Sequence, residues 1–547
     1  MEFDYVIVGG GSAGATLASR LSEDPNVSVC LLEAGGKGNH IFIRTPAALV
    51  AMLSSKLSNW AFETTPQPGL NGRVGYQPRG KALGGSSAIN AMLYIRGHRR
   101  DYEQWAALGC QGWSFDEVLP YFKRAEGNQR GADAFHGAQG PLEVSDQNAP
   151  RPITRDFIDA AKACQHRETD DFNGPEQNGV GYYQTTIFHR KDKRGERCSA
   201  AAAFLHPNLS RPNLHVETNA YADRVLIEDG RAVGVAYRKG KSKTAREVRA
   251  RAEVILSAGA FQSPQLLMLS GVGPGEHLRQ HGITVRSDRA MVGANLQDHP
   301  DFILGYKSRT TDLIGIGLTG AMRLSGAAIT WLRNGGGMLS SPIAEAGAFL
   351  ATTPEYEAWP DIQLHFGIGM IKDHGRAFTP GYGFSCHVCV LRPESRGTVT
   401  LRSPDPAAAP VIDPQFLVDD RDMETLLRGA RMMRQIMTSP PLSNHITQEV
   451  DSDPSWETDA GFEQHIRNKA DTVYHPVGTC AMGAEESAVV DPRLRLRGVR
   501  GLRVVDASIM PRLISGNTNA PSIMIGEKAA DMIKEDAKAG VSALAAE

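Results

Sequence analysis

The stretch Asp4-Tyr5-Val6-Ile7-Val8-Gly9-Gly10-Gly11-Ser12-Ala13-Gly14, close to the N-terminus, decides the fold. Its apolar residues Tyr5 to Val8 predict a short buried strand, and the spacing of Leu17 and Leu21 predicts a helix over 13–21. A second apolar strand is expected at 27–32. Buried strands joined by a helix lie parallel in one sheet, so the N-terminus predicts a β-α-β unit.

The turn between this strand and helix carries the pattern Gly9-x-Gly11-x-x-Gly14, and Glu33 ends the next strand. Glycine permits the tight turn and lets backbone N–H groups approach a pyrophosphate, to which the helix N-terminus adds partial positive charge. Glu33 can accept hydrogen bonds from ribose hydroxyls and would repel a 2′-phosphate, which disfavours NADP. The turn therefore predicts an adenine dinucleotide site, without separating NAD from FAD.

Size and composition limit the possible classes. A chain of 547 residues is long for one core, so two domains or one large two-part unit are expected. Its 41% hydrophobic and 22% charged residues are ordinary for a globular protein. A formal net charge of -2, without a basic stripe, argues against nucleic-acid binding.

The seven cysteines are sparse and odd in number, which is typical of reduced thiols in a cytosolic enzyme. Cys386 and Cys389 form a C-x-x-C within an alternating stretch. Positions i and i+3 of a strand point to opposite faces, so neither a shared metal nor a disulfide is expected there. We predict no metal site.

The sequence predicts no signal peptide and no spanning helix, because no window has about 18 uninterrupted apolar residues. The segment 313–332 is mostly apolar but contains Arg323. It fits a buried helix or a face that touches a membrane, and burial is the commoner case. We expect a cytoplasmic protein, with peripheral contact to the cytoplasmic membrane as the alternative.

The rest of the chain shows two different patterns of expected helices and strands. Residues 55–100 read as a long irregular loop, which is usually functional. Helices are expected at 115–127 and 153–164, and a run of strands between 214 and 257. From 301 to 465 helices, glycine turns and alternating strands mix as a second region. A short strand at 502–506 and a helix at 520–532 resemble the strand and helix at the N-terminus, so the C-terminus is expected to complete the first domain.

Six further segments carry distinctive patterns: Gly80–Asn90, Gly259–Gly273, Gly293–His299, Tyr474–Cys480, Val505–Ser508 and Gly516–Pro521. Together they resemble the signatures of the glucose-methanol-choline (GMC) oxidoreductase family. The likeness covers residues 3 to about 533. It is strongest to bacterial choline-dehydrogenase-like enzymes, especially the membrane-associated, FAD-dependent long-chain alcohol dehydrogenases.

The resemblance implies an α/β fold, α+β overall. A Rossmann-like FAD-binding domain would be built from the non-contiguous segments 1–150, 195–300 and 466–535. A substrate domain with a mainly antiparallel sheet and helices would comprise 151–194 and 301–465. The implied reaction moves a hydride from an alcohol carbon to flavin N5 and leaves an aldehyde or ketone.

Two residues match the family's catalytic positions. His475 takes the place of the catalytic histidine, and an imidazole that titrates near neutral pH can remove the hydroxyl proton. Asn517 matches the second position, where an amide can donate to the substrate oxygen without competing for the proton. The other histidines are expected to be structural, and His98, His299 and His365 are the next to inspect.

The resemblance also implies the flavin contacts. Asn90 to Leu93 would approach the isoalloxazine, Asp506 and Ala507 the ribityl or pyrophosphate, and the backbone of Val225 the adenine. Ile89 stands where some members carry a histidine bonded to FAD, so non-covalent FAD is expected. The full expected set is Gly9, Gly11, Ser12, Ala13, Gly14, Glu33, Ala34, Gly84, Ser87, Asn90, Ala91, Leu93, Val225, Asp506, Ala507, Asn517 and Thr518.

The substrate is marked weakly. The region 313–350 is apolar and favours an apolar, primary alcohol. Its one conspicuous acid, Glu345, could attract a cationic substrate such as choline, but buried acids are normally paired, which we favour. A quinone-like or other electron acceptor is expected. An oxidase using oxygen, a choline dehydrogenase, and a flavin-dependent lyase or photo-decarboxylase stay open as alternatives. The sequence does not predict the oligomeric state.

Overall fold

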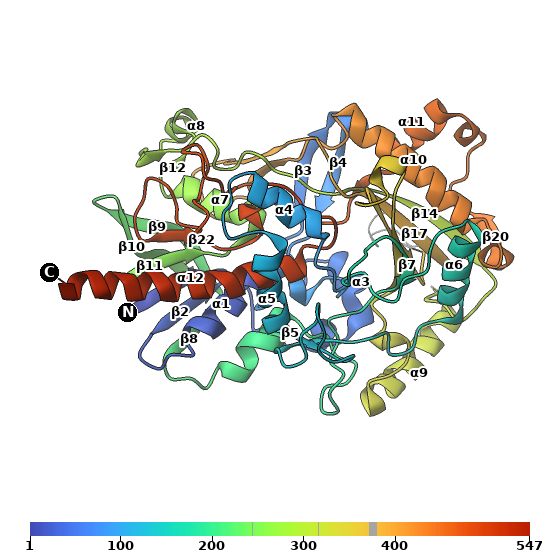
Figure 1. Ribbon diagram of the computed structural model, residues 1–547, viewed down its shortest axis with the longest axis horizontal. Helices are drawn as coiled ribbons and strands as arrows, with labels where there is room; N and C mark the ends of the chain where they lie inside the picture. The colour runs from blue at the N-terminus through green and yellow to red at the C-terminus, as the bar shows by residue number, and fades with distance from the viewer. Residues whose placement is uncertain (243, 316, 371–379, 547) are drawn as a thin grey trace.

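Two seven-stranded sheets organise the computed structural model, which describes residues 1–242, 244–315, 317–370 and 380–546 (Figure 1). The first sheet has the order β8-β2-β1-β11-β10-β9, with β22 beside β11. Its strands are β1 (Glu2–Val8), β2 (Val29–Glu33), β8 (Leu214–Thr218), β9 (Ala220–Glu228), β10 (Arg231–Lys239), β11 (Ala245–Leu256) and β22 (Leu502–Val504).

The pairings of this sheet confirm the predicted parallel core. β1 lies parallel to both β2 and β11, and all five residues of β2 are buried, as expected for a strand covered on both faces. β9 and β10 form an antiparallel hairpin at its edge. Their turn, Asp229-Gly230, has positive φ at both residues, the conformation that a two-residue hairpin needs.

The C-terminus completes the first unit, as predicted. β22 adds to β11 in parallel, and α12 (Asn519–Ala546) packs on α1 (Ser12–Leu21). Gly526 lies so close to α1 that a Cβ would stand 2.6 Å from the Ala13 carbonyl oxygen. The smaller elements of this part are α4 (Arg99–Ala107), α5 (Phe115–Ala125), α7 (Gly259–Leu269), α8 (Gly275–Gln280), β5 (Glu126–Asn128), β6 (Leu142–Val144), β12 (Val272–Gly273) and β13 (Ser287–Asp288).

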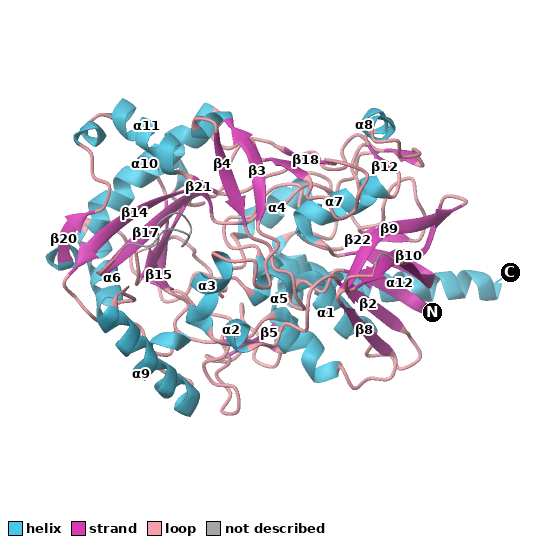
Figure 2. Cartoon of the chain, turned by 180° about the vertical axis from the view of Figure 1, so that it is seen from behind, coloured by secondary structure: helices cyan, strands magenta, loops and turns pink. Residues whose placement is uncertain are grey.

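The second sheet is antiparallel, in the order β20-β14-β17-β16-β15-β7, with β21 beside β14 (Figure 2). Helices α6 and α10 cover its outer face through a shared apolar core. The bounds are β7 (Gly179–Tyr182), β14 (Pro300–Ser308), β15 (Ala344–Leu350), β16 (Ile362–Gly367), β17 (Tyr382–Val390), β20 (Ile446–Glu449), β21 (Asp471–Thr472), α6 (Pro152–Ala163), α9 (Leu318–Asn334), α10 (Asp420–Met437) and α11 (Asp459–Lys469).

Short elements lie between the two sheets. The region 55–100, expected to be irregular, contains an antiparallel hairpin, and Pro66 inside one of its strands hid the alternating pattern. The domain boundaries stay a prediction; β21 falls within 466–535 yet pairs with the second sheet. The short elements are α2 (Ile41–Arg44), α3 (Leu49–Leu53), β3 (Phe62–Gln67), β4 (Arg73–Gln77), β18 (Thr398–Thr400) and β19 (Val411–Asp413).

Helix α9 corrects one expectation. Burial was the favoured interpretation of the apolar segment 313–332, with a face that touches a membrane as the alternative, but Met322, Ile329 and Leu332 are 60%, 54% and 72% exposed. Trp331 is buried and donates its indole N–H to the Gly195 carbonyl. The apolar content therefore does not reflect core packing, because much of the helix faces away from the protein.

The glycine turn gives a first prediction. A Cβ at Gly14 would stand 2.0 Å from the Gly9 carbonyl oxygen, so Gly14→Ala must displace the turn. We expect a loss of roughly 1–3 kcal/mol in the free energy of unfolding and weaker retention of the expected dinucleotide, measured by thermal unfolding and cofactor content. Gly36→Ala is the control, because nothing lies within 4 Å of its Cβ position. Equal behaviour of the two variants would contradict this reading of the turn.

Candidate active site

A cavity of about 380 Å³ joins the two sheets. At one end it is lined by Val8, Glu33 and Ser257, which end or follow β1, β2 and β11. At the other end it reaches His365 and His387, on β16 and β17 of the second sheet. The first end follows the rule that ligands of open α/β sheets bind beyond the carboxyl ends of the strands.

Backbone packs closely on one side of the glycine turn, while a Cβ at Gly11 would have no neighbour closer than 3.9 Å, which leaves room for a dinucleotide on that side. A Cβ at Gly9 would lie 2.3 Å from the Ser257 carbonyl oxygen, and a Cβ at Gly85 would lie 2.7 Å from Gly11 Cα. Helix α1 begins after Gly11 without a side-chain cap. Its first N–H groups are thus available to the pyrophosphate of a dinucleotide.

Glu33 is buried at the end of β2 and held by two backbone donors. Its carboxylate oxygens accept hydrogen bonds from Gly10 N–H at 2.9 Å and Gly35 N–H at 2.7 Å. Each oxygen retains a lone pair for a ribose hydroxyl. Burial raises the pKa of this carboxyl to about 7. The position suits the ribose contact that the sequence predicts.

Most of the predicted cofactor residues lie around this one cavity. Three do not line it. Gly14 packs on Gly9, Gly84 has positive φ and donates its N–H to the Gly10 carbonyl, and Val225 donates its N–H to Ser270 Oγ. The residues that do line it are Gly9, Gly11, Ser12, Ala13, Glu33, Ala34, Ser87, Asn90, Ala91, Leu93, Asp506, Ala507, Asn517 and Thr518, together with His475.

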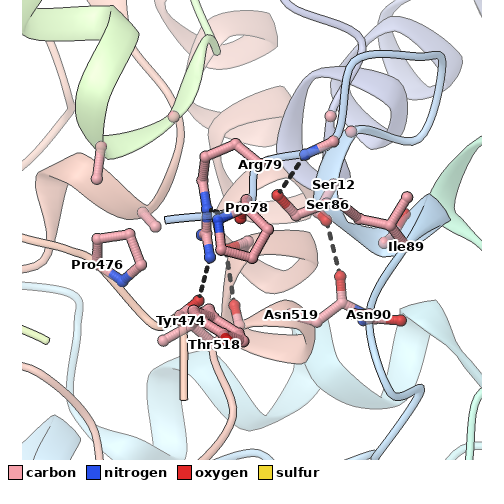
Figure 3. A pocket seen from close by; sticks show the side chains of 18 of the residues that line it. Ser12, Pro78, Arg79, Ser86, Ile89, Asn90, Tyr474, Pro476, Thr518 and Asn519 are labelled. Atoms are coloured by element: carbon pink, nitrogen blue, oxygen red, sulfur yellow. Dashed lines mark hydrogen bonds between the residues drawn. The ribbon is translucent and has the colours of Figure 1, made fainter. Parts of the chain in front are cut away.

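Sequence reasoning missed Arg79, although it lies directly before the Gly80–Asn90 segment. Its side chain enters the cavity lining and donates from Nη2 to the Tyr474 carbonyl at 2.7 Å, while Ser12 reaches Asn519 nearby (Figure 3). Burial lowers the pKa of Arg79 to about 10, which leaves it cationic at neutral pH. Tyr221, which lines the adenine end of the predicted site on β9, was also missed.

The hydrogen bonds of His299 set the protonation of His475. His299 Nε2 lies 3.1 Å from the carbonyl oxygens of Leu391 and Ile514, which can only accept, so Nε2 carries the proton. Burial lowers the pKa of His299 to about 3, so its ring is neutral and Nδ1 is an acceptor. His475 Nδ1 lies 3.0 Å from that atom and must donate to it. The lone pair of His475 is therefore on Nε2.

Asn517 stands at this lone pair. Its Nδ2 lies 3.2 Å from His475 Nε2, and its Oδ1 accepts a hydrogen bond from Gln363 Nε2 at 3.2 Å, which fixes the amide orientation. Both His475 and Asn517 line the cavity. One acceptor and one donor thus meet at a single point, where a hydroxyl group could give its proton and receive a hydrogen bond.

Asp298 contacts the backbone of both histidines. Its Oδ1 accepts the backbone N–H groups of His475 at 2.7 Å and His299 at 2.9 Å. Burial raises the pKa of Asp298 to about 6, opposed by the nearby Arg79. Burial also holds the pKa of His475 well below its usual range, with smaller contributions from His299, His365 and Arg79. At neutral pH the pair is an ionised carboxylate and a neutral imidazole.

Backbone strain gathers around the same cavity. Met92, Ile343 and Tyr474 all have φ between 61° and 73° and all line it. This left-handed region is unfavourable for side chains other than glycine, above all for β-branched isoleucine. Such residues cluster at functional sites, where the surrounding structure maintains them.

Glu345 resolves an alternative left open by the sequence, and two cysteines agree with the strand pattern predicted for them. Glu345 is fully buried and accepts hydrogen bonds from Arg151 N–H, Thr154 Oγ1 and Ser341 Oγ at 2.7–2.8 Å, so it is a paired structural acid. Cys386 and Cys389 belong to different apolar clusters, as expected for opposite faces of β17.

The comparisons with known proteins agree with this geometry. Models of the GMC oxidoreductase family match residues 3–301 and 393–526. The chain belongs to the GMC oxidoreductase family. This GMC protein is accordingly an FAD-dependent oxidoreductase, which agrees with the dinucleotide turn and with the imidazole lone pair and amide donor at the far end of the cavity.

Curated relatives match nearly full length. An alcohol dehydrogenase [acceptor] of Pseudomonas putida is 44% identical over 97% of this chain and 95% of its own. An oxygen-dependent choline dehydrogenase of Rhizobium etli (strain CIAT 652) is 43% identical over 97% and 96%. Among solved structures, pyridoxine 4-oxidase from Mesorbium loti aligns with a TM-score of 0.85 at 32% identity, covering 97% and 98% of the two chains.

The paired groups of this GMC oxidoreductase predict a pH profile. Because the pKa of His475 is lowered, its neutral form prevails at and above neutral pH, and acid first protonates Asp298 near pH 6 and then His475. We expect the rate of anaerobic flavin reduction by an alcohol to be level above about pH 7 and to fall below pH 6. Stopped-flow absorbance measures it, with the flavin spectrum as a control for integrity. A rate that rises steadily through pH 7–9 would contradict this assignment.

Proposed function

We propose that this protein oxidises a primary, largely apolar alcohol to its aldehyde, with His475 as general base and Asn517 as the donor to the substrate oxygen. The observation that carries the proposal is the His475 Nε2 lone pair, 3.2 Å from Asn517 Nδ2, inside the cavity that begins at the dinucleotide turn. When bound, FAD supplies the hydride acceptor at N5 of its ring system.

The protein's own part in the reaction follows from the hydrogen bonds. The alcohol hydroxyl would donate to His475 Nε2, and the proton would move there as the carbon–hydrogen bond weakens, because an alkoxide is a far better hydride donor. Asn517 would stabilise the oxygen. The imidazolium would donate from Nδ1 to His299. The ionised Asp298, which accepts the His475 backbone N–H, would stabilise its positive charge, whereas burial would destabilise it.

The lining favours an apolar alcohol over a cation such as choline. Away from the dinucleotide turn the cavity is lined by Leu49, Val50, Leu53, Leu93 and Ile343. The acids among its described lining residues are Glu33 and Asp506, both assigned to the cofactor. Glu345 is already paired. A quaternary ammonium group would thus meet no carboxylate at the substrate end.

A quinone-like electron acceptor is the proposed oxidant of the reduced flavin. The Pseudomonas putida relative is named for an acceptor, and the Rhizobium etli relative is named as oxygen-dependent. Electron transfer to an acceptor and dependence on oxygen therefore both occur in the names of similar proteins. Reoxidation of the alcohol-reduced enzyme by a soluble quinone should be much faster than by air. Air reoxidation at the turnover rate would contradict the proposal.

The flavin is proposed to be non-covalent, because Ile89 lines the cavity at the expected attachment position and offers no nucleophile. We also propose the division into an FAD part of 1–150, 195–300 and 466–535 and a substrate part of 151–194 and 301–465. The separate sheets support it, since the first draws its strands from the former and the second from the latter except β14, which begins at Pro300, and β21.

Peripheral membrane contact is proposed at a surface formed by α2, α9 and residues 189–195. In Figure 2, α2 and α9 lie along the same lower edge of the molecule. The 189–195 segment joins them, because Gly195 accepts from Trp331 of α9 and the adjacent Glu196 pairs with Arg44 of α2. Among the described residues, five of the twelve exposed large apolar side chains belong to α2 and α9: Ile41, Phe42, Met322, Ile329 and Leu332.

Charge complementarity makes an anionic lipid surface the proposed partner. Helix α9 carries Arg323 and Arg333 and no acid, and the neighbouring exposed residues are mostly cationic. Apolar side chains that enter the interface and cations that meet anionic headgroups are the two requirements of such contact. Among the described helices none is long and apolar enough to cross a membrane. The neighbouring cations are Lys37, Arg44, Lys56, Arg190, Lys191 and Arg194.

His475→Ala tests the catalytic proposal. We expect FAD to stay bound while the rate of anaerobic flavin reduction falls by about 10²–10⁴-fold, the usual loss for a missing general base. His215→Ala is the control, because His215 lies on β8 outside the cavity and pairs with Glu217. Unchanged flavin reduction in His475→Ala would remove this residue from the mechanism.

Leu332→Glu tests the membrane surface, because it places a charge at the most exposed apolar position of α9. We expect co-sedimentation with vesicles of anionic phospholipid to fall at least about tenfold, while activity on a soluble alcohol is retained. Val418→Glu is the matched control, since Val418 is 50% exposed and lies just before α10, which runs along the upper side of the molecule in Figure 2, whereas α9 lies at the lower edge. Equal binding by both variants, or no binding by the wild type, would contradict the proposal.

A further inference from the structure

The cavity-facing side of the second sheet carries polar residues that the proposed reaction does not use. His365 on β16 is directly paired with His387 on β17, and residues opposite each other on neighbouring strands project to the same face. Asp301 lies on the adjoining strand β14, where it pairs with Cys389, two positions from His387. The opposite face of these strands is the apolar core under α10.

His365 has an unmet hydrogen-bonding requirement. It lines the cavity, is only 6% exposed, and its Nδ1 has no hydrogen-bond partner among the described residues. Burial lowers its pKa to about 3, so the ring is neutral. A buried polar atom without a partner costs free energy, and in native structures such atoms are normally satisfied by water or a ligand.

The neighbouring His387 is oriented by a hydrogen bond to Asp301. Its Nδ1 lies 2.7 Å from Asp301 Oδ2, and Asp301 is only 2% exposed. The carboxylate accepts the Nδ1 proton and thereby fixes the ring, as carboxylates do behind functional histidines. The ring itself lines the cavity, so its remaining nitrogen is the part available to a ligand.

These two rings also lie near the reacting point. His365 is close enough to His475 to contribute to the lowering of its pKa, and its strand neighbour Gln363 donates to Asn517 Oδ1. A group bound by His365 or His387 would therefore lie a short distance from the hydroxyl held by His475 and Asn517. The apolar residues of α3 and Ile343 line the same cavity, where they can contact the apolar part of the substrate.

We propose that His365 and His387 form a polar subsite for a second oxygen function of the alcohol substrate, on a carbon close to the one that is oxidised. The substrate class is thus an alcohol with an apolar chain and a neighbouring hydroxyl, ether or carbonyl oxygen, rather than a plain alkanol. This inference rests on the proposed alcohol oxidation and narrows its substrate.

The test compares 1-hexanol with 1,2-hexanediol and 2-butoxyethanol, by anaerobic flavin reduction of the holoenzyme. The wild type should reduce its flavin with the oxygenated alcohols at a kcat/KM about tenfold or more above that with 1-hexanol. His365→Leu should lower the ratio of the oxygenated kcat/KM values to that of 1-hexanol by about 10- to 100-fold, the usual consequence of an unmet polar contact; any effect on His475 is common to all three alcohols and leaves this ratio unchanged. His365→Gln, which keeps a donor and an acceptor, should retain an intermediate preference.

Two results would overturn the subsite: no preference in the wild type, or an equal loss for all three alcohols in His365→Leu. Asp301→Asn gives a second measure that leaves His365 intact, and should weaken the preference through His387. If no alcohol reduces the wild-type flavin, alcohol oxidation itself is contradicted. The subsite is then judged by the Kd of 1,2-hexanediol from the change in flavin absorbance, and equal Kd values for wild type and His365→Leu would overturn it.

Discussion

The direction of one hydrogen bond governs the chemistry proposed for this protein. The carbonyl oxygens of Leu391 and Ile514 can only accept, so His299 must donate to them and accept from His475. That choice leaves the His475 Nε2 lone pair facing Asn517 and the cavity. A base with a different tautomer would present a proton there and could not take one from an alcohol.

Both halves of the molecule are needed to maintain this arrangement. His475 and Asn517 lie in the segment that returns to the first sheet, whereas Gln363, which orients Asn517, belongs to the second. Asp298 precedes β14 and holds the backbone of both histidines. The strained φ angles of Tyr474 and Ile343 occur where these segments meet. The site is therefore a product of the contact between the sheets, and the dinucleotide turn alone would carry no such chemistry.

Features that depend on residues close together in the sequence could be predicted, and features that depend on distant residues could not. The β1-α1-β2 unit and its glycine turn were predictable, because apolar periodicity and the glycines that allow a positive φ can be seen in a short stretch of sequence. The pairing of His475 with His299 was not, since it joins residues far apart in the chain and depends on the tautomer set by two carbonyls. The exposure of α9 was also missed, because an apolar helix has the same sequence pattern whether protein or another partner covers it. Arg79 was missed because its role depends on the Tyr474 carbonyl, which only the fold brings near.

In the reaction that we propose, an alcohol carbon–hydrogen bond breaks at the point defined by His475 and Asn517, with the hydride passing to the flavin. The most direct measurement is anaerobic flavin reduction with an alcohol and with the same alcohol carrying deuterium on the hydroxyl-bearing carbon. We expect bleaching of the oxidised flavin with both, slower with the deuterated alcohol. An oxidised flavin spectrum that persists with every alcohol tried, or bleaching at the same rate with and without deuterium, would contradict it.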